Sequence, residues 1–141
     1  MGLDAVVYRN RKHLQLGPDE ETAQLIPDTG QVYFDNDETS RRHYDQLKAA
    51  DIRLGNISKI AELRDEMIQL AGTTNMLYQK VLYSGSHSGD FVPLDELRLM
   101  LDEIRSVRRT GKPSKELRRF LDQMEELIRT ATNESNPIVF V

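Results

Sequence analysis

The chain of 141 residues contains no cysteine. A disulfide framework, a thiolate metal site and a cysteine nucleophile are therefore excluded. No stretch approaches the roughly 20 consecutive apolar residues that a membrane-spanning helix needs. The first residues carry an acid at position 4 and only a short apolar run, which does not match a secretory signal. We therefore expect a cytoplasmic protein that does not enter a membrane.

Length and charge set further limits. A chain of this length is expected to form one domain, residues 1–141, with a core of its own. The formal net charge is −4, which argues against general binding of nucleic acid. The charges are unevenly distributed, because residues 17–39 carry seven acids and no Lys or Arg, whereas residues 98–119 carry eight bases and three acids. One end of the fold is expected to be acidic and the other basic.

Hydrophobic patterns predict four strands and four helices. The strands are expected at residues 2–9, 31–34, 76–83 and 138–141, where apolar, β-branched and aromatic residues form short runs. Helices are expected from Thr39 or Ser40 to about Arg53, and over residues 57–71, 93–109 and 115–131. Residues 10–30 are expected to be irregular, because Gly17-Pro18 and Pro27-Asp28-Thr29-Gly30 are turn sequences.

The predicted helices have identifiable ends. Asn56 and Ser114 are suited to cap the helices that follow them, Gly72 is suited to end one, and Pro93 fits the first turn of another. The last two helices are joined by a short turn and should form an antiparallel pair. We expect a helix-rich α+β domain in which a small sheet of about four strands is covered by four helices.

The polar loop Ser84-Gly85-Ser86-His87-Ser88-Gly89-Asp90 stands out by composition, with three Ser, two Gly, one His and one Asp. It is expected at the end of a strand and the start of a helix, where ligands often lie in α/β sheets. His87 is a candidate base that Asp90 would orient, and Ser86 is a candidate nucleophile. Ser84, Ser86, His87, Ser88 and Asp90 are also candidates for ligand binding.

The same composition suits a structural loop, in which Asp90 caps a helix and the glycines supply positive φ. The spacing matches neither a P-loop nor the Gly-x-Ser-x-Gly nucleophile elbow. Structural, binding and catalytic interpretations therefore remain open, and no complete catalytic motif is present.

The acidic segment 17–39 is a candidate interaction surface. It combines Asp35, Asp37 and Glu38 with the aromatic Tyr33, and an acidic rim accelerates the capture of a basic partner. A solvated loop is the alternative. The basic stretch 105–119 has no aromatic residue between its bases, so a solvated helix end is favoured there over a phosphate-binding surface.

His13 and His43 stand alone in the sequence and have no ligand-like spacing to another likely metal ligand. We therefore predict no metal site and no cofactor.

Three segments look familiar together: Met1-Gly2-Leu3-Asp4, the stretch Arg53-Leu54-Gly55-Asn56-Ile57 with Ile60-Ala61-Glu62-Leu63-Arg64, and Leu82-Tyr83 with the loop 84–90. They resemble small bacterial proteins, some of which look like immunity proteins of polymorphic-toxin systems. The matching pieces cover about a quarter of the chain. The resemblance implies a cytoplasmic protein that blocks a toxin by binding it, and it supplies no functional residues.

Three hypotheses follow from the sequence. The first is a non-enzymatic binding protein, such as an immunity protein, that contacts a protein partner through segment 17–39 or the loop 84–90. The second is a small hydrolase or phosphate-ligand enzyme built on Ser86, His87 and Asp90. The third is a homo-oligomeric accessory protein, in which the apolar end Ile138-Val139-Phe140-Val141 pairs across a two-fold axis.

Overall fold

The computed structural model describes residues 2–15, 23–35 and 37–141. The elements are β1 (Gly2–Tyr8), the 3₁₀ turn η1 (Arg11–His13), β2 (Gln24–Leu25), β3 (Val32–Tyr33), α1 (Asp37–Arg42), α2 (Tyr44–Leu47), β4 (Lys48–Asn56), α3 (Ile57–Ala71), the π-helix η3 (Leu77–Leu82), β5 (Phe91–Val92), α4 (Leu94–Thr110), α5 (Lys115–Glu134) and β6 (Ile138–Phe140). The mixture of helices with an antiparallel sheet confirms the predicted α+β class.

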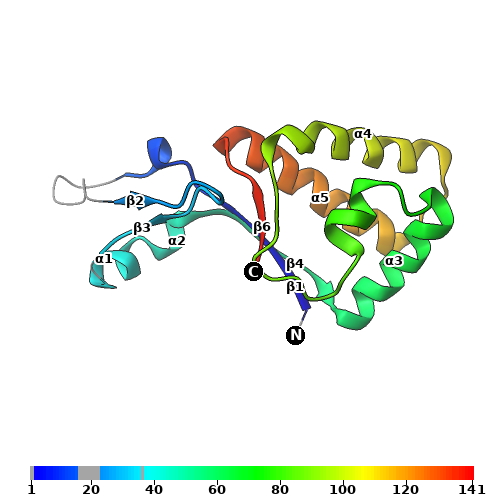
Figure 1. Ribbon diagram of the computed structural model, residues 1–141, viewed down its shortest axis with the longest axis horizontal. Helices are drawn as coiled ribbons and strands as arrows, with labels where there is room; N and C mark the ends of the chain where they lie inside the picture. The colour runs from blue at the N-terminus through cyan, green and yellow to red at the C-terminus, as the bar shows by residue number, and fades with distance from the viewer. Residues whose placement is uncertain (1, 16–22, 36) are drawn as a thin grey trace.

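A four-stranded antiparallel sheet lies at the centre, in the order β4-β1-β6-β5. The two interior strands are therefore β1, which lies between β4 and β6, and β6, which lies between β1 and β5. Figure 1 shows α3, α4 and α5 grouped together at one end of the molecule, with α4 and α5 antiparallel as predicted. The antiparallel pair follows from the short connection between these two helices.

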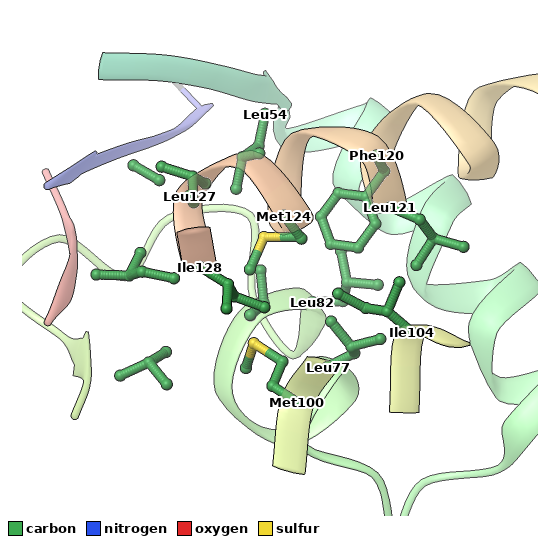
Figure 2. Packing of buried hydrophobic residues seen from close by; sticks show 14 of the residues in the cluster. Leu54, Leu77, Leu82, Met100, Ile104, Phe120, Leu121, Met124, Leu127 and Ile128 are labelled. Atoms are coloured by element: carbon green, nitrogen blue, oxygen red, sulfur yellow. The ribbon is translucent and has the colours of Figure 1, made fainter. Parts of the chain in front are cut away.

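The main core lies between the sheet and the helices. Alternate side chains of β1 enter it, namely Leu3, Ala5 and Val7, as the two-residue period of a strand requires. In Figure 2, Phe120, Leu121 and Met124 of α5 converge with side chains of η3 and α4. The apolar stripe of α5 is buried as its spacing predicts: Leu117, Phe120, Leu121, Met124, Leu127, Ile128 and Ala131.

Three of the predicted helix ends are confirmed. The Asn56 side chain accepts a hydrogen bond from the backbone N–H of Lys59 at 2.8 Å, and the Ser114 hydroxyl accepts one from Leu117 at 3.1 Å. Gly72 ends α3 with φ +74° and donates its N–H to the carbonyl of Ile68. Pro93, by contrast, is the residue that precedes α4 rather than a member of its first turn.

Two predicted elements are wrong. Residues 48–53 were expected at the end of a helix, but they belong to strand β4, which pairs with β1 from Gly2↔Asn56 to Tyr8↔Lys48. This long-range pairing overrides the local helix preference of the segment. Only the short helices α1 and α2 precede it.

Residues 76–83 were expected as a strand, but Leu77–Leu82 form the π-helix η3. Its first turn is capped, because the Glu103 carboxylate accepts the backbone N–H of Met76 at 2.8 Å and Asn75 accepts that of Tyr78 at 2.8 Å. The π-helix also buries Leu77, Val81 and Leu82 together in the core. The apolar residues that suggested a strand are therefore buried on a helix instead.

The central sheet has four strands, as predicted, but only two of them, β1 and β6, are predicted strands. The other two are β4 and β5, and the predicted strands 31–34 and 76–83 are not part of this sheet. Residues 31–34 instead contribute β3, which pairs only with β2 in a small two-stranded sheet. The segment 10–30, expected to be irregular, contains η1 and β2 in its described part.

The described residues between β1 and β4, namely 9–15, 23–35 and 37–47, form a small lobe that projects from one end of the central sheet (Figure 1). The lobe has its own apolar cluster, composed of Leu14, Ala23, Val32 and Phe34 with Leu47 packed against it. The lobe begins where β1 ends and returns to the sheet at β4, and a hydrogen bond from the backbone N–H of Arg9 to the carbonyl of Leu47 at 2.8 Å joins its two ends.

The C-terminal strand is an interior strand. β6 pairs with β1 through Ala5↔Phe140 and with β5 through Val92↔Ile138. The prediction that this apolar strand must find a partner is confirmed. Because both of its edges are paired within the chain, β6 has no free edge for a second copy, and the proposed route to a homodimer is wrong.

Candidate functional site

The loop Ser84–Asp90 follows the π-helix η3 and leads into the short strand β5. The prediction that it lies at a strand end and a helix start is therefore wrong. The loop is fixed to the C-terminal strand by two backbone hydrogen bonds. Gly89 donates to the carbonyl of Phe140 at 2.8 Å, and Phe140 donates to the carbonyl of Asp90 at 2.9 Å.

His87 is the buried centre of this loop, with 8% of its surface exposed. Its Nε2 lies 2.8 Å from the carbonyl of Val81. Because a carbonyl only accepts, Nε2 carries the proton and donates. The ring packs against Tyr83 and, edge-on, against Phe140, with both centroid distances 4.5 Å. These contacts connect the loop to η3 and β6.

Asp90 lies beside His87, as predicted. Its Oδ2 is 3.4 Å from His87 Nδ1 and accepts a hydrogen bond from the Tyr83 hydroxyl. Burial, this hydrogen bond and the negative charge of Asp90 raise the pKa of Tyr83 to about 12. Each of the three favours the neutral phenol over the phenolate.

The serines of the loop do not join this arrangement. The Ser84 hydroxyl accepts from the N–H of Ser86 at 3.2 Å and donates to its carbonyl at 3.3 Å, which closes a tight turn. Ser86 and Ser88 are exposed. Within the described chain, no hydrogen bond joins Ser86 to His87. The geometry therefore favours the interpretation of the loop as a rigid junction.

The pair formed by Tyr83 and Asp90 gives a testable pH dependence. The folded pKa of Tyr83, about 12, lies above the ordinary value of 10.0, so its contribution to stability is complete below pH 10 and is lost as the pH rises towards 12. Replacing Asp90 by Asn should lower the pKa of Tyr83 in a spectrophotometric titration of tyrosinate. In the control Tyr83→Phe, the part of the titration curve that is due to Tyr83 should be absent. If the Asp90→Asn titration matches that of the wild type, the pairing is refuted.

The acidic segment is described only in part. Tyr33 is exposed and donates its hydroxyl hydrogen bond to Gln24. Asp35 is exposed and accepts from the Gln24 amide at 3.4 Å. Glu38 is exposed on α1. Asp19, Glu20 and Glu21, together with the side chain of Asp37, lie outside the described residues.

A hollow of about 410 Å³ lies where the lobe meets the sheet. Its aromatic lining is Tyr8 from β1, Tyr33 from β3 and Tyr44 from α2. Its other lining residues are Gln31, Val32, Ser40, Leu47, Lys48 and Val141. We call this the tyrosine hollow. Tyr44 is 61% exposed and Tyr33 38%, and Leu25 and Ile26 are exposed apolar residues of the same lobe.

The sequence interpretation missed most of this hollow. Of its tyrosines it singled out only Tyr33, and Tyr44 lies within the helix that was expected from Thr39 or Ser40 to about Arg53. That helix is absent, so Tyr44 faces solvent instead. The tyrosines come from β1, β3 and α2, and no local motif connects them.

One cation already lies at the tyrosine hollow. Lys48 Nζ is 5.5 Å from the centre of the Tyr44 ring and 3.4 Å from Asp51 Oδ2. Tyr8 is nearly buried, and burial raises its pKa, while the positive charge of Lys48 opposes that increase. The tyrosine hollow therefore combines exposed aromatic rings with one cation, Lys48, whose charge is balanced by Asp51.

A second polar cluster, also missed from the sequence, fastens the lobe to the end of α5. Glu134 is buried, and its carboxylate lies 2.5 Å from His13 Nδ1 and 3.7 Å from Arg9 Nε. Asn10 donates to the Glu134 carbonyl at 2.8 Å. These contacts give Glu134 a structural role.

The other histidine, His43, is buried against the Phe34 ring at 5.5 Å. Across the described ranges, no group of three or more His, Asp or Glu side chains is placed to hold a metal ion. No helix in the same part of the chain is long and apolar enough to cross a bilayer. In the basic stretch, Arg108 is paired with Asp122 at 2.7 Å and Glu125 at 3.2 Å.

The three segments that carry the resemblance to immunity proteins meet in one corner. A Cβ added at Gly2 would lie 2.5 Å from the carbonyl oxygen of Gly55, and one added at Gly85 would lie 2.9 Å from the Cα of Ile57. Asp4 pairs with Arg53 at 2.8 Å. These residues therefore make close contacts with one another, and none of them lines the tyrosine hollow.

No protein-family model matches the chain, and neither the curated proteins nor the solved structures contain a significant match.

Proposed function

We propose that this chain is a non-enzymatic binding protein that contacts a protein partner through the tyrosine hollow. The observation that carries the proposal is the exposure of Tyr33 and Tyr44 around an open hollow of about 410 Å³. Tyrosine is enriched at protein interfaces because it presents a large apolar surface with a polar tip. Exposed Leu25 and Ile26 extend the apolar surface of the lobe.

The structure of the loop 84–90 disfavours the alternative proposal of a hydrolase built on Ser86, His87 and Asp90. The His87 ring is held in packing, because its Nε2 donates to the carbonyl of Val81 and its faces and edge contact two aromatic rings, and no hydrogen bond joins it to Ser86 in the described chain. A general base must reach the proton that it removes. The exposed surface of the lobe is therefore the better candidate for function.

We further propose that the partner is a toxin, which the chain neutralises by covering it. The resemblance of three segments to immunity proteins supports this class. The exposed acids Asp28, Asp35 and Glu38 of the segment 17–39 can attract a basic protein, although Arg41 and Arg42 at the end of α1 are exposed on the same lobe.

A site-specific cross-link tests the surface. A photoreactive benzoylphenylalanine at position 44 should capture the partner in cells, whereas the same group at position 99 should not. Leu99 is the matched control because it is 56% exposed on α4 and does not line the tyrosine hollow. Equal capture at both positions would contradict the proposal.

The captured protein then allows an affinity measurement. Tyr44→Ala should weaken binding by about 2 kcal/mol, or roughly thirtyfold, as removal of a central interface aromatic does. Leu99→Ala should leave the affinity within about twofold of the wild type. For an immunity protein, Tyr44→Ala should also fail to protect cells that express the partner. Binding that survives Tyr44→Ala would place the interface elsewhere.

A further inference from the structure

The tyrosine hollow has the chemistry of a site for a cation. A tyrosine ring attracts positive charge to its face, within about 6 Å of the ring centre. Three tyrosines line the hollow: Tyr8, Tyr33 and Tyr44. Among the described residues, the only acid that forms an ion pair with Lys48, the charged residue of the lining, is Asp51, three residues later on the same strand β4.

Lys48 shows how a cation is held there. Its ammonium group lies 5.5 Å from the Tyr44 centroid and 3.4 Å from Asp51 Oδ2. Both partners of the ammonium group are largely exposed, since Asp51 is 56% and Tyr44 61% exposed, although the Lys48 side chain itself is 28% exposed. A surface ion pair contributes little to stability, so Lys48 can leave this position at low cost. Tyr44 and Asp51 then become available to another cation.

We propose that the tyrosine hollow binds an arginine side chain of the partner, which takes over the contacts that Lys48 makes in the free protein. This inference rests on the proposed function. A guanidinium group is planar and weakly hydrated, and it stacks on aromatic faces better than an ammonium group does. Arginine can contact the Tyr44 ring with its face and the Asp51 carboxylate with its N–H groups.

The proposal predicts that removing the charge of Lys48 strengthens the binding of arginine to the tyrosine hollow. Lys48 repels an incoming cation and occupies its carboxylate. Lys48→Met removes the charge while its side chain keeps an apolar stem along the hollow. The matched control is Lys80→Met, since Lys80 also pairs with a carboxylate, that of Glu96 at 3.8 Å, and does not line the tyrosine hollow.

A small probe tests the site without the partner. The probe is acetyl-arginine methylamide, with the uncharged acetyl-citrulline methylamide as its isostere, titrated against the full chain and followed by the NMR signals of the tyrosine rings. We expect the arginine probe, and not the citrulline probe, to shift the Tyr44 and Tyr33 signals. Lys48→Met should strengthen arginine binding about threefold, Lys80→Met should not change it, and Tyr44→Leu should weaken it about three- to tenfold.

The outcomes separate the two proposals. Equal shifts with both probes, or no shift with either, would overturn the arginine site, and so would a Lys48→Met variant that binds the arginine probe more weakly than the wild type. Because the partner is absent from this titration, the result does not depend on whether the hollow is a protein interface. Tyr44 is largely exposed and Lys48→Met keeps the apolar stem, and an unchanged thermal unfolding midpoint will show that both variants are folded.

Discussion

Replacing Phe140 by alanine is expected to lower the free energy of unfolding by about 3–5 kcal/mol. The Phe140 side chain is fully buried in the main core. It also packs edge-on against His87, and its backbone holds the loop through Gly89 and Asp90. The substitution therefore removes a large apolar side chain at the point where the C-terminal strand joins the polar loop to the core. Urea denaturation followed by circular dichroism measures the change.

The neighbouring residue provides the control for this experiment. Val141 is 43% exposed and its backbone N–H donates to the carbonyl of Asp4 at 2.9 Å, a bond that alanine retains. Val141→Ala should therefore change the free energy of unfolding by less than about 0.5 kcal/mol. A Phe140→Ala effect below about 1 kcal/mol would show that β6 is not an interior strand of the sheet.

Replacing Gly30 by alanine is expected to destabilise the protein by roughly 2–4 kcal/mol, through two separate costs. Gly30 has φ +74°, a conformation that a residue with a Cβ adopts only with strain. In addition, a Cβ at Gly30 would overlap the side-chain amide of Asn136. That amide is buried and donates to the carbonyl of Tyr8 at 2.7 Å, so displacing it leaves a buried acceptor without its partner.

Gly72 separates the two costs. It has the same φ of +74°, but a Cβ added there would meet nothing within 4 Å. Gly72 has ψ −159°, a backbone region that is almost confined to glycine, so Gly72→Ala should show backbone strain without a steric contact, roughly 1–3 kcal/mol. The difference between the two variants reports the contact of Gly30 with Asn136. Equal losses of stability in the two denaturation curves would contradict this contact and the docking of the lobe on the end of α5.

The sequence predicts those parts of the fold whose signals are local. α3 and α5 have capping side chains at their first residues and apolar stripes at helical spacing, and both signals are confirmed by Asn56, Ser114 and the buried face of α5. β1 and β6 are short apolar runs that must be buried, and the sheet buries them at its centre.

The segments whose secondary structure was predicted wrongly depend on contacts with residues that are distant in the sequence. Residues 48–53 have no strong strand pattern of their own and become β4 because β1 offers a partner over its whole length. Residues 77–82 become helical because Glu103, on α4, caps their first N–H groups. Neither partner can be identified from the segment itself.

The functional surface is harder to predict than the fold for the same reason. The loop Ser84–Asp90 draws attention by composition, yet its histidine is used in packing. The tyrosine hollow has no composition signal, because Tyr8, Tyr33 and Tyr44 come from three elements that meet only after β1 and β4 have paired.

The central claim is that a protein partner covers the tyrosine hollow, and hydrogen exchange of the complex tests it most directly. We predict that partner binding slows amide exchange in β3 and α2, the segments that carry Tyr33 and Tyr44, and leaves the loop 84–90 and α4 unchanged. Protection confined to the loop 84–90 or to α4, with β3 and α2 exchanging as in the free protein, would contradict the account.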